Sequence, residues 1–485
     1  MQIYNTLSKE NEEFKPIAED ELVLYVCGLT PYDKAHIGHA RTYVAFDIIK
    51  RYLIKTGKYR NILHIQNITD VDDKIIKRCK ETGAEPKTLT ETNHRNALEL
   101  FDKLRIIRAD VYPKVTEHIP EIISTIEKIM KNGYAYETKT GVYFDVSKFK
   151  KYGKLSGQNV EELSSGSRKE VDETKEDSAD FALWKKTNGE IIEFDSPWGK
   201  GRPGWHIECS AMSIKYAKRT IDIHGGARDL IFPHHENEIA QSEAANGFSF
   251  VKYWMHTGFL TVNGEKMSKS LGNFITIDEV LSKYEPNAVR MFFALAHYRS
   301  PIDYNEDQIE AAGESAERLL NALGLINEKL EAKRKAKTDK EFRKTTDEMI
   351  ANMKTAMEND FDTPTAMASL FELVRESNSQ VTKKETDCEQ LTKIKEELEK
   401  ILWILGIEEN KANVENKKEE LVKLLTEFSA EKEDSPEKMI EILIELRNSA
   451  RKKKDFKTAD EIRKKLNAIG IALEDKDGRT SWKVA

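Results

Sequence analysis

Short apolar runs alternate with amphipathic stretches over roughly the first 110 residues, which is the pattern of an α/β domain. Leu22 to Val26 is an uninterrupted apolar run that predicts a buried strand. The apolar positions between Val44 and Ile49 predict a helix, and Tyr59 to Ile65 predicts a second strand. We therefore expect a Rossmann-like parallel sheet at the start of the chain.

The turn between the first strand and its helix is rich in polar residues, over Cys27 to Asp47. Gly28 permits a tight backbone there, and His36 and His39 stand three residues apart. On a first helical turn both imidazoles would share one face beside unpaired N–H groups, which is a good place to bind phosphate. Two histidines on a helix are more often ordinary surface or core residues, so this motif needs support from elsewhere in the chain.

A second polar cluster, Asn67 to Lys74, follows the second predicted strand. Ligands of doubly wound sheets lie beyond the carboxyl ends of the strands, so Asp70, Asp72 and Asp73 are candidate site residues. The same residues are suited to capping the next helix, and we favour capping for at least one of them.

The sheet pattern is interrupted after about residue 110 and resumes near residue 199. The intervening part holds a helical segment, a strand predicted at Gly141 to Phe144, and a charged, Ser-rich run from Glu161 to Ala179. We interpret the part of this run near Glu170 to Asp177 as a solvated surface loop. Helical periodicity with Lys and Glu pairs dominates from Glu306 to Leu405, as in a helix bundle. Near the end, Ala450 to Lys465 carries eight basic and three acidic residues, and Gly470 to Trp482 predicts a small hairpin.

Composition restricts the possible classes of protein. The chain has 485 residues, with 39% hydrophobic, 33% charged and 8% aromatic residues, which suits a folded, helix-rich protein and excludes a disordered one. The net charge of −7 means that nucleic acid would be bound by local basic patches and not by the overall field. Four scattered cysteines do not form a disulfide framework, and we interpret Cys79 and Cys388 as inert thiols. Neither a signal sequence nor a membrane-spanning run is predicted, so we expect a cytoplasmic protein.

A metal site is one interpretation of two distant segments. His234 and Glu238 are four residues apart and follow Pro233, so a helix beginning there would direct both side chains to one cation. Cys27 and Cys209 are candidate partners, since one imidazole, one carboxylate and two thiolates would make a tetrahedral zinc site. The spacing alone leaves an equally good alternative, in which the two cysteines are buried core residues and the His-Glu pair is exposed.

Two motifs resemble the signatures of class I aminoacyl-tRNA synthetases. They are His36-Ile-Gly-His39 and Lys266-Met-Ser-Lys269-Ser, in this order, with glycines on both sides of the second. Four further stretches resemble the cysteinyl-tRNA synthetases in particular, and the resemblance extends from near the N-terminus to the last residues. These stretches are Cys27 to Asp33, Thr69 to Lys74, Gly204 to Met212 and Pro233 to Glu238.

The resemblance implies a Rossmann-like α/β catalytic domain split by an insertion and followed by an α-helical C-terminal half. The expected divisions are a first catalytic half (1–110), a connective insertion (111–198), a second catalytic half (199–256), a stem-contact region with the lysine motif (257–304), a helical bundle (305–435) and a small anticodon-binding domain (436–485). In the stem-contact region the family's usual Asp-Ala-Leu-Arg sequence is present as Asn-Ala-Val-Arg, over Asn287 to Arg290.

The resemblance also implies a role for individual residues. The catalytic residues, which also bind ATP, are His36, His39, Lys266 and Lys269. The zinc ligands are Cys27, Cys209, His234 and Glu238. The residues around the substrate cysteine are Gly28, Thr69, Trp205, His206, His224 and Asp229.

These roles agree with the chemistry of selecting cysteine. An apolar pocket discriminates weakly between cysteine and serine, whereas zinc binds a thiolate in preference to a hydroxyl. The implied partners are L-cysteine, ATP with Mg2+, tRNA(Cys) and one Zn2+ per chain. The expected enzyme is a monomer. It forms cysteinyl-adenylate and then transfers cysteine to the 3'-terminal adenosine of the tRNA. Two alternatives are an ATP-dependent ligase that joins cysteine to a small-molecule amine, and a non-catalytic zinc, nucleotide or RNA-binding protein. The long, basic C-terminal end argues against the first, and the intact lysine pair against the second.

Overall fold

The computed structural model describes residues 1–19, 21–57, 59, 61–158, 174–268, 271–332, 337–409, 417–476 and 479–484. It divides into two compact units, Met1–Ile407 and Glu408–Ala485. Among the described residues, no helix is long and apolar enough to cross a membrane. Residues 159–173 lie outside the described residues, and they include most of the charged run 161–179 and the first half of the predicted loop. Lys269 and Ser270 also lie outside the described residues.

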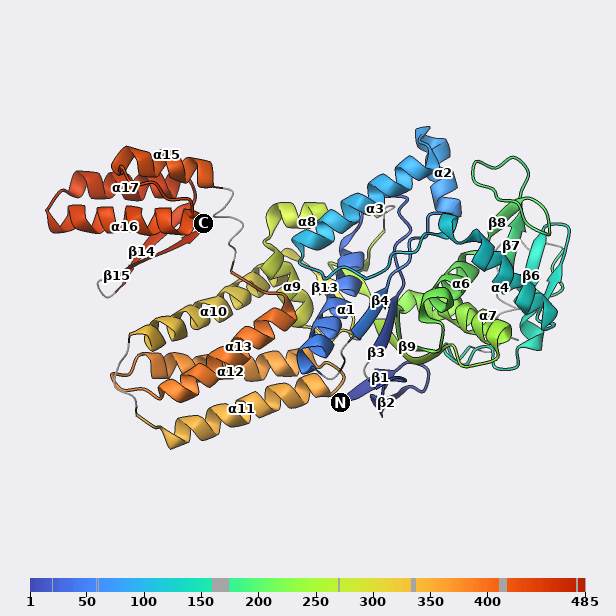
Figure 1. Cartoon of the computed structure of the whole chain (residues 1–485), viewed down its shortest axis with the longest axis horizontal. Helices are drawn as coiled ribbons and strands as arrows, with labels where there is room; N and C mark the ends of the chain where they lie inside the picture. The colour runs from blue at the N-terminus through green and yellow to red at the C-terminus, as the bar shows by residue number, and fades with distance from the viewer. Residues whose placement is uncertain are drawn as a thin grey trace. The chain divides into compact units, whose positions relative to one another are not determined.

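A four-stranded parallel sheet stands at the centre of the first unit (Figure 1). Its order is β10 (Val251–Thr257), β9 (Ile221–Ala227), β3 (Glu21–Val26) and β4 (Asn61–Ile65), and every neighbouring pair is parallel. The two predicted strands are present, although the second begins at Asn61. The strand order reverses between β3 and β9, and open α/β sheets bind their ligands at such a point.

Alternation along β3 assigns its side chains to two different cores. Val26 belongs to the core that α1 (Ile37–Thr56) covers. Cys27 belongs to the core shared with α6 (Trp205–Ala217) and α7 (Glu236–Asn246). Since successive strand residues point to opposite faces, the place of Cys27 directly after the strand directs its thiol toward α6 and α7.

The insertion forms an antiparallel sheet beside the central one. Its order is β5 (Ala135–Glu137), β6 (Gly141–Phe144), β7 (Phe181–Lys186) and β8 (Gly201–Pro203), so the predicted strand at Gly141 is confirmed and the sheet ends past residue 198. Helix α4 (Ile119–Lys131) packs into the same core as α6 and α7. The other elements around the central sheet are β1 (Gln2–Asn5), β2 (Glu10–Glu13), α2 (Asp73–Thr82) and α3 (Pro86–Lys103).

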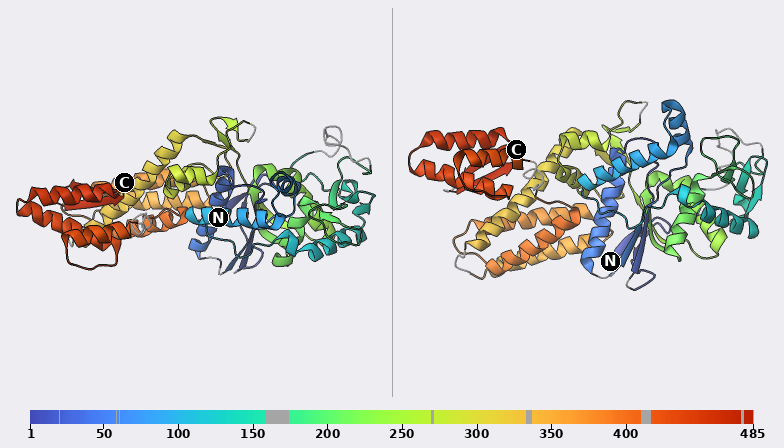
Figure 2. Two further views of the ribbon diagram at one scale, coloured as in Figure 1. Left: turned by 90° about the horizontal axis from the view of Figure 1, so that it is seen from above. Right: turned by 45° about the horizontal axis from the view of Figure 1, so that its top comes forward.

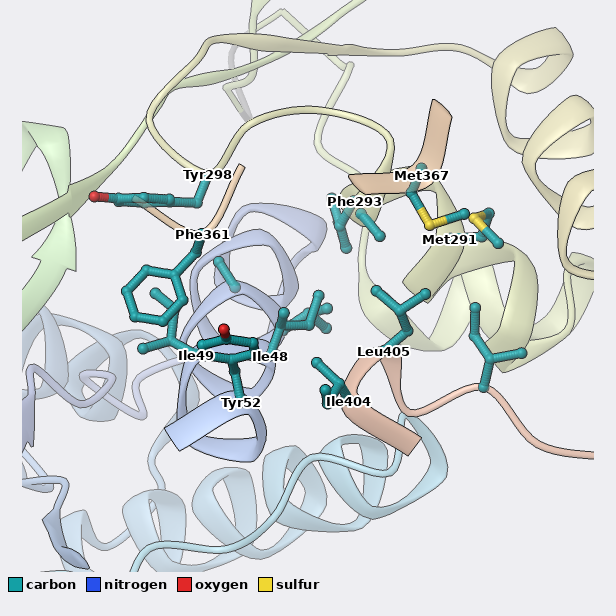
Figure 3. Close-up of a cluster of buried hydrophobic side chains, with 14 of the residues drawn as sticks. Ile48, Ile49, Tyr52, Met291, Phe293, Tyr298, Phe361, Met367, Ile404 and Leu405 are labelled. Atoms are coloured by element: carbon teal, nitrogen blue, oxygen red, sulfur yellow. The ribbon is translucent and has the colours of Figure 1, made fainter. Parts of the chain in front are cut away.

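A small sheet and a helical bundle complete the first unit. β11 (Leu260–Val262), β12 (Glu265–Lys266) and β13 (Ile302–Tyr304) form the sheet, and the helices are α8 (Ile277–Lys283), α9 (Pro286–Ala294), α10 (Glu306–Glu331), α11 (Lys340–Glu358), α12 (Thr363–Val381) and α13 (Cys388–Leu405). Helix α1 runs between the central sheet and this bundle (Figure 2). In the core that joins them, Ile48 and Tyr52 of α1 lie among Met291 of α9, Met367 of α12 and Leu405 of α13 (Figure 3).

Arg290 is wholly buried where α1, α9 and α13 meet. Its guanidinium lies 2.5 Å from the Asp47 carboxylate and donates to the carbonyl oxygens of Leu104 and Leu405 at 2.8 and 2.5 Å. A Cβ at Gly406 would lie 2.3 Å from the guanidinium, so the end of α13 fits closely around it. The arginine of the predicted stem-contact sequence therefore joins the catalytic part to the bundle, and its side chain is not exposed to RNA.

Asp387 caps α13 and fastens it to α11. Arg343 Nε and Nη2 donate to its two carboxylate oxygens at 2.6 and 2.8 Å, and the N–H groups of Asp339 and Gln390 donate at 3.0 and 3.2 Å. These bonds lower the pKa of Asp387 from 3.8 to about 2, and the hydrogen bond from Arg343 has the largest effect. A carboxyl group with a depressed pKa stabilises the fold above its unfolded pKa, and that contribution disappears as the pH falls from about 4 to about 2.

We expect Asp387→Asn to lower the free energy of unfolding by about 2 kcal/mol at pH 7, because the amide loses the charge-assisted pairing with Arg343. At about pH 3 the difference from the unchanged chain should shrink to about half. Urea denaturation at both pH values measures it. An equal difference at the two pH values would contradict the assignment.

The second unit has one core of its own. It consists of α15 (Lys418–Phe428), α16 (Pro436–Lys452), α17 (Phe456–Ala468) and the antiparallel pair β14 (Ile471–Lys476) and β15 (Arg479–Val484), which is the hairpin predicted near the end of the chain. The apolar side of α15 packs with α16 and α17. Helix α15 thus belongs to this unit, and the division after Ile407 precedes the boundary that we expected at 435.

Candidate active site

Four buried side chains meet beyond the carboxyl ends of β3 and β9. The segment η4 (Ile231–His235) and the start of α7 bring His234, His235 and Glu238 to Cys27, with one ligand atom of each within 4.8 Å of the others. His234 Nε2 is 2.8 Å from Glu238 Oε1, and Cys27 Sγ is 3.8 Å from the same oxygen. Three of the four predicted zinc ligands are therefore together in this cluster.

Cys209, the fourth predicted ligand, is buried on α6 beside the same cluster. The interaction with the Cys27 thiol, helped by His234, lowers the pKa of Cys209 to about 6 against the effect of burial. The set of mutually close donors contains His235, which we did not predict, in place of Cys209.

The electrostatics of the cluster are those of polar donors enclosed away from water. Burial raises the pKa of Cys27 well above its usual value, and Cys209 and Glu238 add to the effect. Burial alone would lower the pKa of His234, but Glu238 and Cys209 outweigh it and raise the pKa to about 10. Burial would likewise raise the pKa of Glu238, yet His224 and His234 lower it to about 2. The carboxylate and its histidine partner thus form a buried ion pair, and the imidazole would have to release its proton to bind a cation.

Further histidines orient these donors. His224 Nε2 lies 2.9 Å from Glu238 Oε2. His235 Nε2 lies 3.3 Å from Cys27 Sγ, while its Nδ1 lies 2.7 Å from Nε2 of His256. Burial, together with the neighbouring imidazoles, lowers the pKa of His235 well below its usual value, so the ring is neutral. We did not predict His235 or His256 as site residues. The sequence pointed to His235 only through its position next to His234, and nothing in the sequence pointed to His256.

Gly28 and Thr69 are joined through Asn67, which lies after β4. The Gly28 N–H donates to Asn67 Oδ1 at 2.8 Å, and Asn67 Nδ2 donates to Thr69 Oγ1 at 3.1 Å. A Cβ at Gly28 would lie only 1.6 Å from the Asn67 carbonyl oxygen, so this position requires glycine. Asn67, which we did not single out, thus fixes the distance between the two predicted pocket residues.

Three of the remaining predicted pocket residues are at the start of α6 and in the turn after β9. Trp205 is the first residue of α6 and is 39% exposed. The centroid of its ring lies 4.3 Å from that of the His234 ring. His206 Nδ1 lies 2.9 Å from His234 Nδ1. Asp229 lies in the short turn η3 (Arg228–Leu230) after β9 and is exposed. Trp205 and His206 therefore lie against one of the predicted zinc ligands, and Asp229 lies on the turn that follows β9.

The aspartates after β4 have structural contacts. Asp72 caps α2 by accepting a main-chain N–H at 2.7 Å. Asp70 accepts from the hydroxyl of Thr116 at 2.6 Å, and Asp73 lies 3.0 Å from the ammonium of Lys185. The capping interpretation is confirmed for Asp72.

The first signature lies at the N-terminus of α1, with the two imidazoles stacked. Their ring centroids are 3.7 Å apart, and the N–H of His36 donates to His39 Nδ1 at 3.2 Å. Burial, together with His36 and Lys74, lowers the pKa of His39 well below its usual value. A neutral imidazole at a helix N-terminus is a hydrogen-bonding group for phosphate oxygens.

The described part of the second signature lies over this same turn. Lys266 is exposed in β12. Met267 packs on the first turn of α1, since its methyl would be 3.6 Å from a Cβ added at Gly38. The two signatures, far apart in sequence, are therefore brought together except for Lys269, which lies outside the described residues.

Three family models match the chain. That of the tRNA synthetases class I (C) catalytic domain matches residues 13–314, that of a DALR domain matches 352–409, and that of the cysteinyl-tRNA ligase anticodon binding domain matches 438–482. The second match lies in the helical bundle and does not include Asn287 to Arg290.

Related proteins match over the full length of the chain. Proteins named cysteine–tRNA ligase from Thermococcus onnurineus and Pyrococcus horikoshii are 48% and 49% identical to it over 488 residues, covering 100% of this chain and 99% of each relative. Among solved structures, the Mycobacterium tuberculosis methionyl-tRNA synthetase in complex with methionyl-adenylate has a TM-score of 0.60 at 14% identity, over 80% of this chain and 90% of that one. The predicted fold class is thereby confirmed, and the chain belongs to the cysteinyl-tRNA synthetase family of the class I aminoacyl-tRNA synthetases.

Proposed function

We propose that this chain activates L-cysteine with ATP and transfers it to tRNA(Cys). One observation carries the proposal: thiol, imidazole and carboxylate donors meet beside the nucleotide signature in a chain whose full-length relatives are named cysteine–tRNA ligases. The match of the C-terminal unit to an anticodon-binding domain favours tRNA over a small-molecule amine as the acceptor.

The donor set fits zinc, which takes sulfur, nitrogen and carboxylate ligands in compact sites. We assign Cys27, Cys209, His234 and Glu238 as the ligands. His235 is assigned to orient Cys27, because its other ring nitrogen already bonds a neighbouring histidine. Bound zinc would hold the substrate sulfur as a thiolate and so favour cysteine over serine.

The chain's own residues shape the rest of the amino acid pocket. The ring of Trp205 covers His234 and provides an apolar wall for a short side chain. Thr69 accepts a hydrogen bond from Asn67, which leaves its own hydroxyl hydrogen to donate to the substrate. Asp229, an exposed carboxylate after β9, is suited to the substrate ammonium group.

Activation requires little covalent work from the protein. A carboxylate oxygen of cysteine attacks the α-phosphorus of ATP, the bond from that phosphorus to the bridging oxygen breaks, and pyrophosphate leaves with the electron pair. His36 and His39 donate hydrogen bonds to the phosphates, and Lys266 and Lys269 supply positive charge as negative charge moves onto the leaving group. Mg2+ accompanies the nucleotide in this account. In the second step a hydroxyl of the terminal adenosine attacks the acyl carbon, and AMP leaves.

The second unit offers an RNA-binding surface at the turn between α16 and α17. Arg451 to Lys454 form an exposed basic run, and Phe456, which follows at the start of α17, is 58% exposed. Trp482 of β15 is partly buried against the core of the unit, so Phe456 is the more accessible of the two rings. An exposed ring beside cations is suited to stacking an unpaired base.

We expect Phe456→Ala to raise the KM for tRNA about tenfold, because stacking of one base contributes roughly 1–3 kcal/mol. Aminoacylation kinetics measure KM, and cysteine-dependent exchange of pyrophosphate into ATP should stay unchanged. Phe248→Ala, which removes a 41% exposed ring from the other unit, is the matched control. An unaltered KM for tRNA in the Phe456 variant would show that this ring does not meet the RNA.

Two assays test the proposed function. The unchanged chain should exchange pyrophosphate into ATP only when cysteine is present, and should then transfer labelled cysteine to tRNA(Cys). Exchange without transfer to tRNA would indicate a ligase with another acceptor, and absence of exchange would indicate a binding protein. Light scattering in solution tests the expected monomer, and fractionation of cells tests the expected cytoplasmic location.

A further inference from the structure

The side chain of Asn273 is hydrogen-bonded to the backbone of two residues of the lysine signature, Lys266 and Ser268. The N–H of Ser268 donates to Asn273 Oδ1 at 2.8 Å, and Asn273 Nδ2 donates to the carbonyl oxygen of Lys266 at 3.2 Å. The N–H of Leu271 also donates to the Ser268 hydroxyl at 3.3 Å. The primary amide of Asn273 therefore satisfies one donor and one acceptor of the signature backbone at once, which needs an amide and not a carboxylate.

The other side of Lys266 is held by a rigid hairpin. Lys266 pairs with Thr261 in the β11–β12 ladder. Asp303 of β13 accepts from the Thr261 hydroxyl at 2.6 Å and from the N–H of Gly264 at 2.7 Å, which fixes the turn between β11 and β12. The backbone of Lys266 is thus held on one side by its pairing with β11, and on the other side by the hydrogen bond from the Asn273 amide.

The segment after Asn273 is paired with the first signature. The N–H of Ile37 donates to the carbonyl oxygen of Ile275 at 3.0 Å, and the N–H of Ile277 donates to that of Ala35 at 3.0 Å. These two bonds enclose His36. Asn273 therefore lies between the first lysine of the second signature and a segment that is bonded to the histidine signature.

We propose that Asn273 is a positioning residue for adenylate formation: its amide fixes the backbone of Lys266 and Ser268 so that the lysine ammonium faces the phosphates beside His36 and His39. The inference rests on the proposed function. Its physical basis is that charge stabilisation in a transition state depends on groups already held in place, and a lysine on an untied loop must be ordered during the reaction. The cysteine pocket has no contact with Asn273 among the described residues, so cysteine binding should not depend on it.

The test compares Asn273→Ala, Asn273→Asp and the control Asn263→Gly in the full-length chain, by cysteine-dependent exchange of pyrophosphate into ATP. Asn263 lies in the turn of the same hairpin at a φ of 51°, a conformation that glycine adopts readily. Within the described part of the chain only its main-chain N–H is hydrogen-bonded. We expect Asn273→Ala to lower kcat at least tenfold while the KM for cysteine changes less than twofold. Asn273→Asp keeps the acceptor for Ser268 and loses the donor for Lys266, so its kcat should fall between those of the alanine variant and the unchanged chain.

Thermal denaturation separates positioning from folding, since all three variants should melt within about 2 °C of the unchanged chain. The proposal is overturned if Asn273→Ala exchanges as fast as the unchanged chain. It is also overturned if the variant loses exchange together with thermal stability or with affinity for cysteine. Failure of the unchanged chain to exchange at all would instead refute the proposed function.

Discussion

Cys209→Ser is expected to lower cysteine-dependent exchange of pyrophosphate into ATP by at least about 100-fold, and to lower the zinc content of the purified chain well below one per molecule. The serine hydroxyl occupies nearly the same space, but it is far more basic than a thiol that already has its pKa lowered to about 6. The substitution thus removes a proposed zinc ligand without opening a cavity. Exchange assays together with metal analysis of the same preparation measure both effects.

Two control variants show whether the loss of zinc and of activity is specific to Cys209. His235→Gln should retain most of its zinc, because in this account the ring only orients Cys27. Cys388→Ser, at the start of α13, should match the unchanged chain in both assays. Loss of zinc in the His235 variant with retention in the Cys209 variant would reverse the assignment and make the donors Cys27, His234, His235 and Glu238.

Arg290→Leu is expected to lower the free energy of unfolding by about 3–5 kcal/mol. The substitution would leave Asp47 with one ion-pair partner fewer in a wholly buried place and remove the donors for the carbonyl oxygens of Leu104 and Leu405. Urea denaturation of the full-length chain measures the change.

The exposed Arg375 provides the control for this prediction. Arg375→Leu removes the same charge from the surface of α12 and should change the free energy of unfolding by no more than about 0.5 kcal/mol. If Arg290→Leu were as mild as this control and instead raised the KM for tRNA, the residue would be an RNA contact and the structural role would be wrong.

The parts of the fold set by local pattern could be predicted from the sequence. The apolar run before Cys27 forms β3, and Gly141 to Phe144 forms β6, because a run of apolar residues bounded by turns has few other stable conformations. The boundary of the C-terminal unit could not be located in this way. Helix α15 has the same Lys and Glu periodicity as the bundle, and only the packing of its apolar face on α16 assigns it to the second unit.

Some residues of the candidate site could likewise be predicted from the sequence, and others could not. Residues within a motif, such as His36 and His39, were recognisable because the motif itself has a fixed spacing. Asn67 and His256 were not, because they act through side chains that reach across from other strands, and a single sequence carries no record of that contact. The motif placed Arg290 in a stem-contact region, whereas its burial and its bonds to Asp47, Leu104 and Leu405 are visible only in three dimensions.

We propose that one metal ion, held between β3, α6 and α7, lets the chain accept cysteine and reject serine. The most direct test is kcat/KM for exchange with each amino acid, measured on one preparation before zinc removal, after it, and after zinc is restored. We predict that cysteine activation is lost on removal and returns with zinc, while serine activation stays low throughout. A zinc-free chain that still prefers cysteine to the same degree would contradict the claim.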